Sequence, residues 1–267
     1  MACPQQFELL PKGLNSFATS AKCVLWSWCH AHHVTEKVKQ MKLLLIAVVA
    51  IAPMLAKDHE ATKRIDDSAV VFSEIMAADD KGIPQDLLEH AHCIVIVPDL
   101  KTAAFIVGGK YGKGIISCRN KGNAGWSAPG TVRIEGGSVG FQIGGSSTDL
   151  VMLVMNATGA NKLLEDKFTL GGEGSVAAGP VGRTATAQTD AMMHAEILSW
   201  SRSQGLFAGI SLQGATLRQD LDDNTAIYGK RLTNRNILTG GRKVPASASK
   251  LITMLNRYSF REDHKSE

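Results

Sequence analysis

The chain has 267 residues, of which 44% are hydrophobic and 20% charged, a composition typical of a folded globular protein and not of a disordered or collagen-like chain. A chain of this length can bury about 70–75% of the surface it exposes when unfolded, so it can form a core without disulfides or metals. The formal net charge of +4 is too small to steer the whole chain toward nucleic acid. No nucleic-acid partner is therefore expected.

The first 56 residues differ from the rest of the chain. Lys42 follows Met41, and an apolar run of about 14 residues extends from there to Ala56. This run is shorter than the roughly 20 residues of a membrane-spanning helix and is typical of a secretory signal peptide. We predict that residues 1–40 are an upstream mis-start or an unstructured leader, that residues 41–56 are a signal peptide, and that residues 57–267 form the domain.

This organisation predicts where the protein resides. A signal peptide at residues 41–56 indicates export, to the periplasm or the envelope of a bacterium. If the signal that begins at Met41 is not used, the expected location is the cytoplasm. Peptide mapping of the natural N-terminus would separate the two.

The cysteines give no clear metal pattern. Three of the five (Cys3, Cys23 and Cys29) lie in the leader, with a spacing that matches no standard zinc site. Cys93 and Cys118 lie in apolar, strand-like contexts of the domain. Buried free thiols and a disulfide are both compatible with these contexts, and the sequence leaves the choice open.

The elements expected at the start of the domain are two helices and a strand. Apolar residues recur every three or four positions over residues 58–78, which predicts an amphipathic helix. Pro84 favours the start of a short helix that runs to about Ala91. Residues 93–97 are mostly β-branched and predict a buried strand that Pro98 stops.

A glycine-rich region follows, with eighteen of the 26 glycines between Gly108 and Gly182. Glycines that alternate with short apolar runs predict bent or bulged strands. We expect strands at residues 104–107, 114–118, 131–134, 139–143, 150–155, 195–201 and 207–213, and helices near 160–167, 220–228 and 247–258. The predicted fold is a single α+β domain with a curved, Gly-rich, largely antiparallel sheet and amphipathic helices at both ends.

One motif suggests catalysis. Residues 136–140 match G-x-S-x-G, with Ser138 as the nucleophile and His194 as a possible partner. That motif requires a turn from a strand into a helix, whereas residues 141–145 are predicted to be strand. A serine hydrolase that uses Ser138 is thus the less favoured alternative, and no catalytic residue is assigned.

Two further motifs resemble metal sites. His90, His92 and Cys93 lack a further ligand nearby, and the Asp220-x-Asp222-x-Asn224 sequence has Arg231 where a calcium loop needs its last glutamate. Surface placement and helix capping explain both groups better than metal binding does. No metal and no other cofactor is expected.

The C-terminal region is basic. Residues 230–267 contain nine basic and three acidic residues. Such a region suits an anionic, phosphate-bearing surface, although a merely solvated positive face is an open alternative. The candidate lipid-binding residues in this region are Lys230, Arg231, Arg235, Arg242, Lys243 and Lys250, with Arg257 and Arg261 further along.

Five ordered motifs resemble the SYLF domain family, and in particular its bacterial lipid-binding members. They are residues 93–98 (CIVIVP), 105–114 (FIVGGKYGKG), 125–129 (GWSAP), 136–144 (GGSVGFQIG) and 224–229, within a match from Ala61 to Leu238. The resemblance implies a non-enzymatic module that binds phosphoinositides, phosphatidic acid or other anionic phospholipids. Eukaryotic relatives also bind and bundle actin and act in membrane trafficking.

The resemblance also implicates an N-terminal amphipathic helix in lipid contact, which makes Lys63 and Arg64 candidate lipid-binding residues. The same helix carries Asp66, Asp67 and Glu74, so we give the C-terminal region equal weight. Export would place the protein out of reach of actin. The expected partner is an anionic membrane surface, protein partners are left open, and the alternative is a structural or protein-interaction component of the envelope.

Overall fold

The computed structural model describes residues 59–78, 82–105, 107–120, 125–139, 144–179, 195–203, 206–207 and 211–259. The chain divides into two compact units, Met1–Leu55 and Ala56–Glu267, and all described residues belong to the second. The predicted leader and signal peptide lie outside them, as do His194 and Arg261. No helix within the described ranges is long and apolar enough to cross a membrane.

The second unit is an α+β domain with helices before and after the strands, as the sequence predicts. The first helix spans residues 59–76. The elements that follow are α2 (Gln85–His90), β1 (Cys93–Phe105), β2 (Val107–Cys118), β3 (Gly130–Val139), β4 (Gly144–Val154), α3 (Ala157–Leu163), β5 (Lys167–Thr169), β6 (Val176–Ala178), β7 (Ile197–Ser203), β8 (Leu206–Phe207), β9 (Thr216–Gln219), α5 (Leu221–Tyr228), α6 (Asn234–Leu238), the 3₁₀ helix η2 (Ala246–Ala248) and α7 (Ser249–Tyr258).

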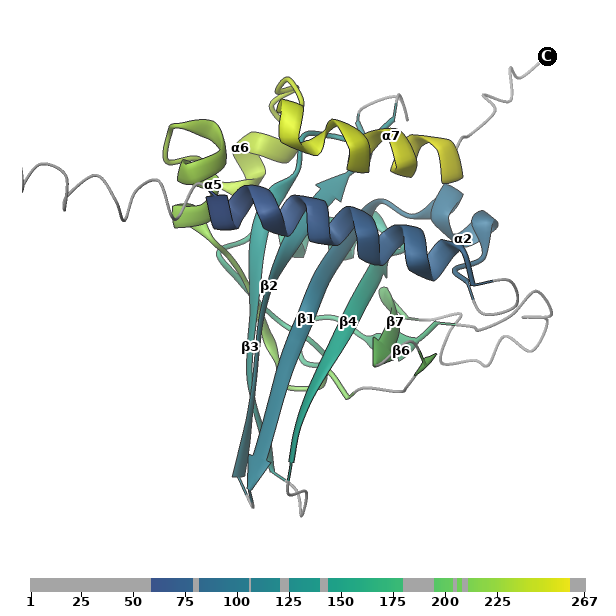
Figure 1. Ribbon diagram of the computed structural model, residues 1–267, viewed down its shortest axis with the longest axis vertical. Coiled ribbons are helices and arrows are strands. Elements are labelled where there is room, and N and C mark those ends of the chain that lie inside the picture. Colours follow the sequence, from purple (N-terminus) through teal and green to yellow (C-terminus); the bar gives the residue numbers. More distant parts are fainter. Residues whose placement is uncertain are drawn as a thin grey trace, which may run out of the picture. The chain divides into compact units, whose positions relative to one another are not determined.

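The strands form one curled sheet (Figure 1). Their order is β5-β9-β3-β2-β1-β4-β7-β6, and β8 pairs with β7 beside this path. Among the strand pairs of the described chain, β6–β7 is parallel and the others are antiparallel. The prediction of a largely antiparallel sheet is therefore confirmed.

Pro98 does not end the strand that precedes it, so this part of the prediction is wrong. β1 continues through Pro98, and its pairing with β2 shifts register between Ile96 and Lys101. Asp99, in the middle of the shift, has a φ of 56°. The bulge interrupts the ladder of hydrogen bonds at the point where proline has no N–H to donate, so the strand can resume beyond it.

Glycines of β2 make room for this bulge. A Cβ atom at Gly112 would lie 2.8 Å from Leu100 Cδ1, and one at Gly114 would lie 2.2 Å from Ile96 O. Residues 114–118, predicted as a separate strand, are the end of the long strand β2, since glycine continues the ladder before them. The single strand predicted at residues 104–107 is wrong, because these residues are divided between the end of β1 and the start of β2, where Phe105 pairs with Val107. The prediction at residues 139–143 falls mainly outside the described residues.

Three other boundaries differ from the prediction. The helix expected near residues 160–167 is α3, which starts earlier because the Asn156 side chain caps it by accepting a hydrogen bond of 2.7 Å from Gly159 N. Of the strand expected at residues 207–213, Phe207 ends β8, whereas the described residues 211–213 are not in a strand and the next strand, β9, begins at Thr216. Helix α6 was not predicted, since its five residues are too few to show a period.

The sheet buries apolar side chains on both faces. On one face the first helix, α2 and α7 pack against the strands, and Phe72 meets Tyr258 of α7 with ring centroids 5.8 Å apart. In Figure 1 the first helix (dark blue) and α7 (yellow) lie side by side across these strands. On the other face, α3, β5, α6 and the start of β9 contribute to a second core. The central strands therefore contribute side chains to two hydrophobic cores, one on each face of the sheet.

The pairing of the two cysteines, which the sequence left open, is a disulfide. Cys93 and Cys118 are bonded across the paired ends of β1 and β2. Beside this bond, the Arg119 guanidinium donates hydrogen bonds to Leu88 O (3.0 Å) and to Ser259 O (2.9 Å), and its charge stacks 4.4 Å from the Trp126 ring centroid. One side chain thus ties α2 and the end of α7 to the sheet.

Candidate functional site

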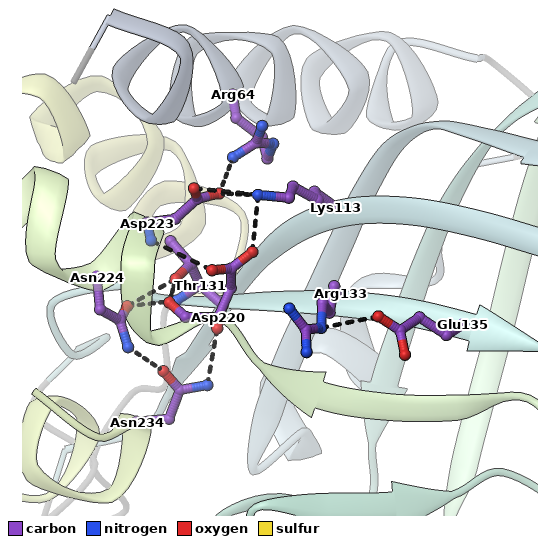
Figure 2. A network of polar contacts seen from close by, with 9 residues as sticks. All are labelled: Arg64, Lys113, Thr131, Arg133, Glu135, Asp220, Asp223, Asn224 and Asn234. Atoms are coloured by element: carbon purple, nitrogen blue, oxygen red, sulfur yellow. Dashed lines mark hydrogen bonds and ion pairs between the residues drawn. The ribbon is translucent and has the colours of Figure 1, made fainter. Parts of the chain in front are cut away.

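Helix α5 begins in a network of buried charges (Figure 2). The side chain of Asp220 caps the helix by accepting a hydrogen bond from Asp223 N. Lys113 of β2 places its Nζ 2.8 Å from Asp220 and 3.1 Å from Asp223, and Arg64 of the first helix forms an ion pair with Asp223. Two carboxylates and two cations balance in this network, so charges from three distant segments can be buried together.

The electrostatics of this network favour its charged form. Burial alone would raise the pKa of Asp220, but the ammonium of Lys113, the N–H of Asp223 and the charge of Arg133 lower that pKa below its usual value. Burial alone would lower the pKa of Lys113, whereas its contacts with Asp220 and Asp223 raise it. Both groups therefore stay ionised over the whole neutral range.

An uncharged network continues from the charged one and holds α5 and α6 against β3. The side-chain oxygen of Asn224 accepts hydrogen bonds from Thr131 N (2.9 Å) and Thr131 Oγ1 (2.8 Å). Asn224 Nδ2 donates to Asn234 Oδ1 (2.9 Å), and Asn234 Nδ2 donates to Thr131 O (3.0 Å). A Cβ at Gly130 would lie 2.5 Å from Asn234 Oδ1, so glycine is required there. The side-chain amides of Asn224 and Asn234 thus satisfy each other's hydrogen-bonding groups and hold α5 and α6 against β3.

These networks support a surface that we call the basic segment, residues 230–259. It contains no Asp or Glu. Its cations all have exposed side chains, and none forms an ion pair with another described residue. They are Lys230, Arg231, Arg235, Arg242, Lys243, Lys250 and Arg257. The segment therefore presents positive charge that the rest of the described chain does not neutralise.

Arg242 lies close to Tyr228 of α5. The Tyr228 hydroxyl donates a hydrogen bond of 2.6 Å to Pro129 O, and burial raises the pKa of this tyrosine although the charge of Arg242 opposes the shift. Tyr228 therefore remains neutral beneath the basic segment. Its ring packs against the small core of Ala128, Leu232 and Ile237 and adds no negative charge near Arg242.

The structure places the two candidate cations of the first helix differently. Lys63 is exposed, and its Nζ lies 2.7 Å from Asp67 on the same helix. Arg64 is largely buried, with 16% of its side chain exposed, in the network with Asp223. The exposed face of this helix also carries Glu60, Asp66 and Glu74. The candidates of the first helix thus differ from those of the basic segment, because both Lys63 and Arg64 form ion pairs.

The buried network itself was missed by reasoning from the sequence. Its members are separated by up to 159 residues, as in the pair of Arg64 with Asp223, and no local pattern links them. One signal was present: Lys113 is a charged residue in a strand whose next residues, from Gly114 to Cys118, are uncharged and end in the core. A lysine at such a position needs a carboxylate partner.

Those residues of the predicted catalytic and metal-binding motifs that lie in the described part of the chain have structural roles. Ser138 lies inside β3, paired with Gly108, and not at a turn from a strand into a helix. Cys93 is in the disulfide, and Asp220 and Asn224 belong to the networks around α5. Within the described ranges, no group of three or more His, Cys, Asp or Glu side chains is placed to hold a metal ion.

Comparison with known proteins identifies relatives. A family model described as Ysc84, "Las17-binding protein actin regulator", matches residues 135–258. The chain is 35% identical over 216 residues to protein YSC84 of Saccharomyces cerevisiae, which covers 79% of this chain and 46% of the relative. It is 33% identical over 210 residues (77% of this chain, 45% of the relative) to LAS seventeen-binding protein 3 of the same yeast.

A human protein is similar to the same degree. The chain is 33% identical over 199 residues to SH3 domain-containing YSC84-like protein 1 of Homo sapiens, which covers 73% of this chain and 57% of the relative. The chain spans about half the length of the curated relatives it matches. The family model is described as a binding protein and regulator, and LAS seventeen-binding protein 3 is named for binding; neither description names an enzymatic activity. The residues that the family model matches include α5, α6 and nearly all of the basic segment.

Proposed function

The chain carries a domain of the Ysc84/SYLF family, and on this premise we propose that it is a non-enzymatic phospholipid-binding module that docks on anionic membrane surfaces through the basic segment. The observation that carries the proposal is a run of thirty residues with seven exposed cations and no carboxylate. Each Lys or Arg near an anionic bilayer contributes about 1 kcal/mol, so four engaged together suffice for reversible attachment. Phosphatidic acid and phosphoinositides present the matching phosphate charge.

The packing of α7 supports an electrostatic mode for the proposed attachment. Leu251, Ile252 and Leu255 are buried against the sheet, whereas Lys250 and Arg257 are exposed. The apolar face of α7 is therefore occupied inside the domain and is not free to enter a bilayer. Attachment through exposed cations alone is screened by salt.

The first helix has a smaller part in this proposal. Lys63 is exposed and can add to a basic surface, but the acidic residues on the same face oppose it. Arg64 would have to leave Asp223 in order to reach a lipid phosphate. Separating such a largely buried pair costs several kcal/mol, more than one lipid contact returns.

Co-sedimentation of the full chain with vesicles tests the proposal. The chain is mixed with vesicles of neutral phosphatidylcholine, or with vesicles that also contain phosphatidic acid or a phosphoinositide, at low and at moderate salt. We expect salt-sensitive binding to the anionic vesicles only. The double variant Arg242→Glu/Lys243→Glu should bind at least about tenfold more weakly, since two attractive charges are lost.

A matched control reverses the charge of Lys167, an exposed residue of β5 outside the basic segment. The variant Lys167→Glu should bind as the unaltered chain does. Equal binding to neutral and anionic vesicles, or no binding to either, would exclude the electrostatic lipid proposal.

A second candidate is an acidic protein surface in place of a lipid surface. The family model that covers the basic segment is described as a Las17-binding actin regulator. The same seven cations would suit acidic side chains on such a protein partner. Co-sedimentation with actin filaments, using the same two variants, separates this candidate from lipid binding. A structural role in the envelope would give neither response.

We also propose that the protein is exported, to the periplasm or envelope of a bacterium. The apolar run after Met41 supports this location, and the disulfide suits an oxidising compartment. Export would exclude actin as a partner. A natural N-terminus upstream of Met41 would instead favour the cytoplasm and the actin candidate.

A further inference from the structure

The disulfide joins two strand ends that lie close to the end of α7. Cys93 is the first residue of β1, Cys118 is the last residue of β2, and the register pairs them directly. Both are buried, at 1% and 8% exposure. After reduction, two separate thiols must occupy the space of one bonded pair. A close-packed interior has little spare room, so the strand ends must move apart.

Hydrogen bonds lead from Cys118 to the C-terminal end of α7. Cys118 N donates to Ser127 Oγ (3.1 Å), and Ser127 N donates to Cys118 O (2.8 Å). Arg119 follows Cys118 and Trp126 precedes Ser127, and these two residues pair as an isolated antiparallel β-bridge. Arg119 donates to Ser259 O, and Trp126 Nε1 donates to Ser259 Oγ at 2.8 Å. Each link joins neighbouring groups, so a shift at the disulfide reaches α7 through few bonds.

The polar contacts of α7 with the sheet lie at its C-terminal end, near Ser259. Trp126 N donates a further hydrogen bond of 3.1 Å to Asn256 Oδ1. At the N-terminal end of α7, no side chain of the described residues caps the helix. The Ser249 hydroxyl there donates to Ala246 O, three residues before it (2.9 Å). Within the described part of the chain, the polar contacts of α7 with the sheet are thus at the end next to the disulfide.

We propose that the Cys93–Cys118 disulfide clamps α7, and with it Lys250 and Arg257 of the basic segment, in the position that binds anionic surfaces. Reduction releases the clamp, loosens α7 and weakens the attachment. The part that concerns attachment rests on the proposed lipid function, whereas the part that concerns α7 does not.

The chemical step is thiol–disulfide exchange with a dithiol as the reductant. A thiolate of the dithiol attacks one cysteine sulfur, which forms a mixed disulfide and releases the other cysteine as a thiolate. The second thiolate of the dithiol then attacks the dithiol sulfur of the mixed disulfide, which closes a cyclic disulfide and releases the remaining cysteine thiolate. The Cys93–Cys118 bond gains two electrons from the dithiol, and two protons end on the two cysteine thiols. The reverse exchange, with an oxidised dithiol, restores the clamp.

Hydrogen exchange of the full chain, oxidised and after treatment with dithiothreitol, tests the clamp. Mass spectrometry of the cysteine peptides verifies that both thiols have formed. We expect exchange in residues 249–259 to accelerate by about tenfold or more, while residues 216–228 of β9 and α5 keep their rates. Equal acceleration in both regions would overturn the proposal, because the bond would then act only on the stability of the whole domain. Unchanged exchange in residues 249–259 would overturn it as well.

Variants keep the test independent of how readily a buried disulfide is reduced. The double variant Cys93→Ala/Cys118→Ala should loosen α7 without any reductant. The variant Ser259→Ala removes the hydroxyl that accepts the hydrogen bond from Trp126 Nε1, and it should loosen α7 while the disulfide stays intact. Its matched control is Ser249→Ala, at the other end of the same helix, which should leave exchange at residues 255–259 unchanged. Loosening by the control and not by Ser259→Ala would contradict the clamp.

Binding to vesicles that contain phosphatidic acid completes the test. The reduced chain should bind at least about threefold more weakly than the oxidised chain, since two of seven cations lose their fixed position. Unchanged binding with a loosened α7 would overturn the coupling to attachment. If the oxidised chain does not bind these vesicles at all, the proposed lipid function fails, and the exchange rates still decide whether the clamp exists.

Discussion

Arg64 of the first helix and Asp223 of α5 form an ion pair across 159 residues of sequence. The pair shares its carboxylate with Lys113 of β2. The first helix, the sheet and the helix that leads into the basic segment are thus joined at one point.

Removal of the shared carboxylate should destabilise the domain. The variant Asp223→Asn leaves Arg64 and Lys113 with one carboxylate instead of two in a largely buried position, and we expect a loss of about 2–4 kcal/mol in the free energy of unfolding. Urea denaturation followed by circular dichroism measures it. The control Asp66→Asn, on the exposed face of the first helix, should change stability by less than about 0.5 kcal/mol.

Stability should fall at acid pH because of Asp220. Its pKa in the folded state lies below its ordinary value of 3.8, so the unfolded chain binds a proton first as the pH drops. The contribution of Asp220 is fully present above about pH 4 and is lost as the pH falls through the lowered pKa. Urea midpoints between pH 2.5 and 6 should show this loss.

The variant Asp220→Asn should flatten the acid limb of that profile, whereas Asp86→Asn, an exposed residue of α2, should leave it unchanged. An acid limb that persists in Asp220→Asn would show that other carboxylates dominate.

Lys113 contributes to stability at the alkaline limit. Its pKa in the folded state lies above 10.5, so its contribution to stability is complete below that pH and is lost as the pH rises through the raised pKa.

The amide network should be as sensitive as the charged one. Asn224 is fully buried, accepts from Thr131 N and donates to Leu232 O at 3.0 Å. The variant Asn224→Ala leaves these two buried groups without partners, which should cost about 3 kcal/mol. Asn236→Ala, an exposed asparagine of α6, is the matched control. Equal midpoints in urea for the two variants would contradict the role of the network.

Two glycines of the sheet should respond in opposite ways to a methyl group. A Cβ at Gly114 would lie 2.2 Å from the backbone oxygen of Ile96, whereas a Cβ at Gly137 would meet nothing within 4 Å. Gly114→Ala should therefore destabilise the domain by more than about 2 kcal/mol. Gly137→Ala should be neutral or stabilise by up to about 1 kcal/mol, because the unfolded chain loses freedom. Thermal unfolding of both variants decides the matter.

The elements that the sequence predicted well are those whose burial follows a short period. Ile65, Phe72 and Ile75 repeat along one face of the first helix, and that face is the one that packs on the sheet. Leu251 and Leu255 do the same in α7. Local periodicity is enough in these cases, because one side of each helix meets the core and the other meets water.

The elements that were predicted poorly depend on distant contacts. The bulge at Pro98 is accommodated by missing side chains at Gly112 and Gly114 on the next strand. The family resemblance makes Arg64 a candidate lipid contact, and this stays a prediction; what the sequence does not show is its pairing with Asp223, because no neighbouring residue points to that partner. The pair of Lys63 with Asp67 follows from their spacing of four residues in the first helix, whereas the pair of Arg64 with Asp223 follows only from the fold.

The position of β9 in the sheet bears on how the protein is made. β9 lies between β5 and β3, and α7 completes the core on the other face. A growing chain that has not yet reached residues 216–258 leaves the outer edge of β3 open and the apolar residues beneath α7 uncovered. Open strand edges and uncovered apolar surface promote aggregation. The nascent domain therefore passes through an interval of raised aggregation risk during synthesis, which lasts until α7 has docked.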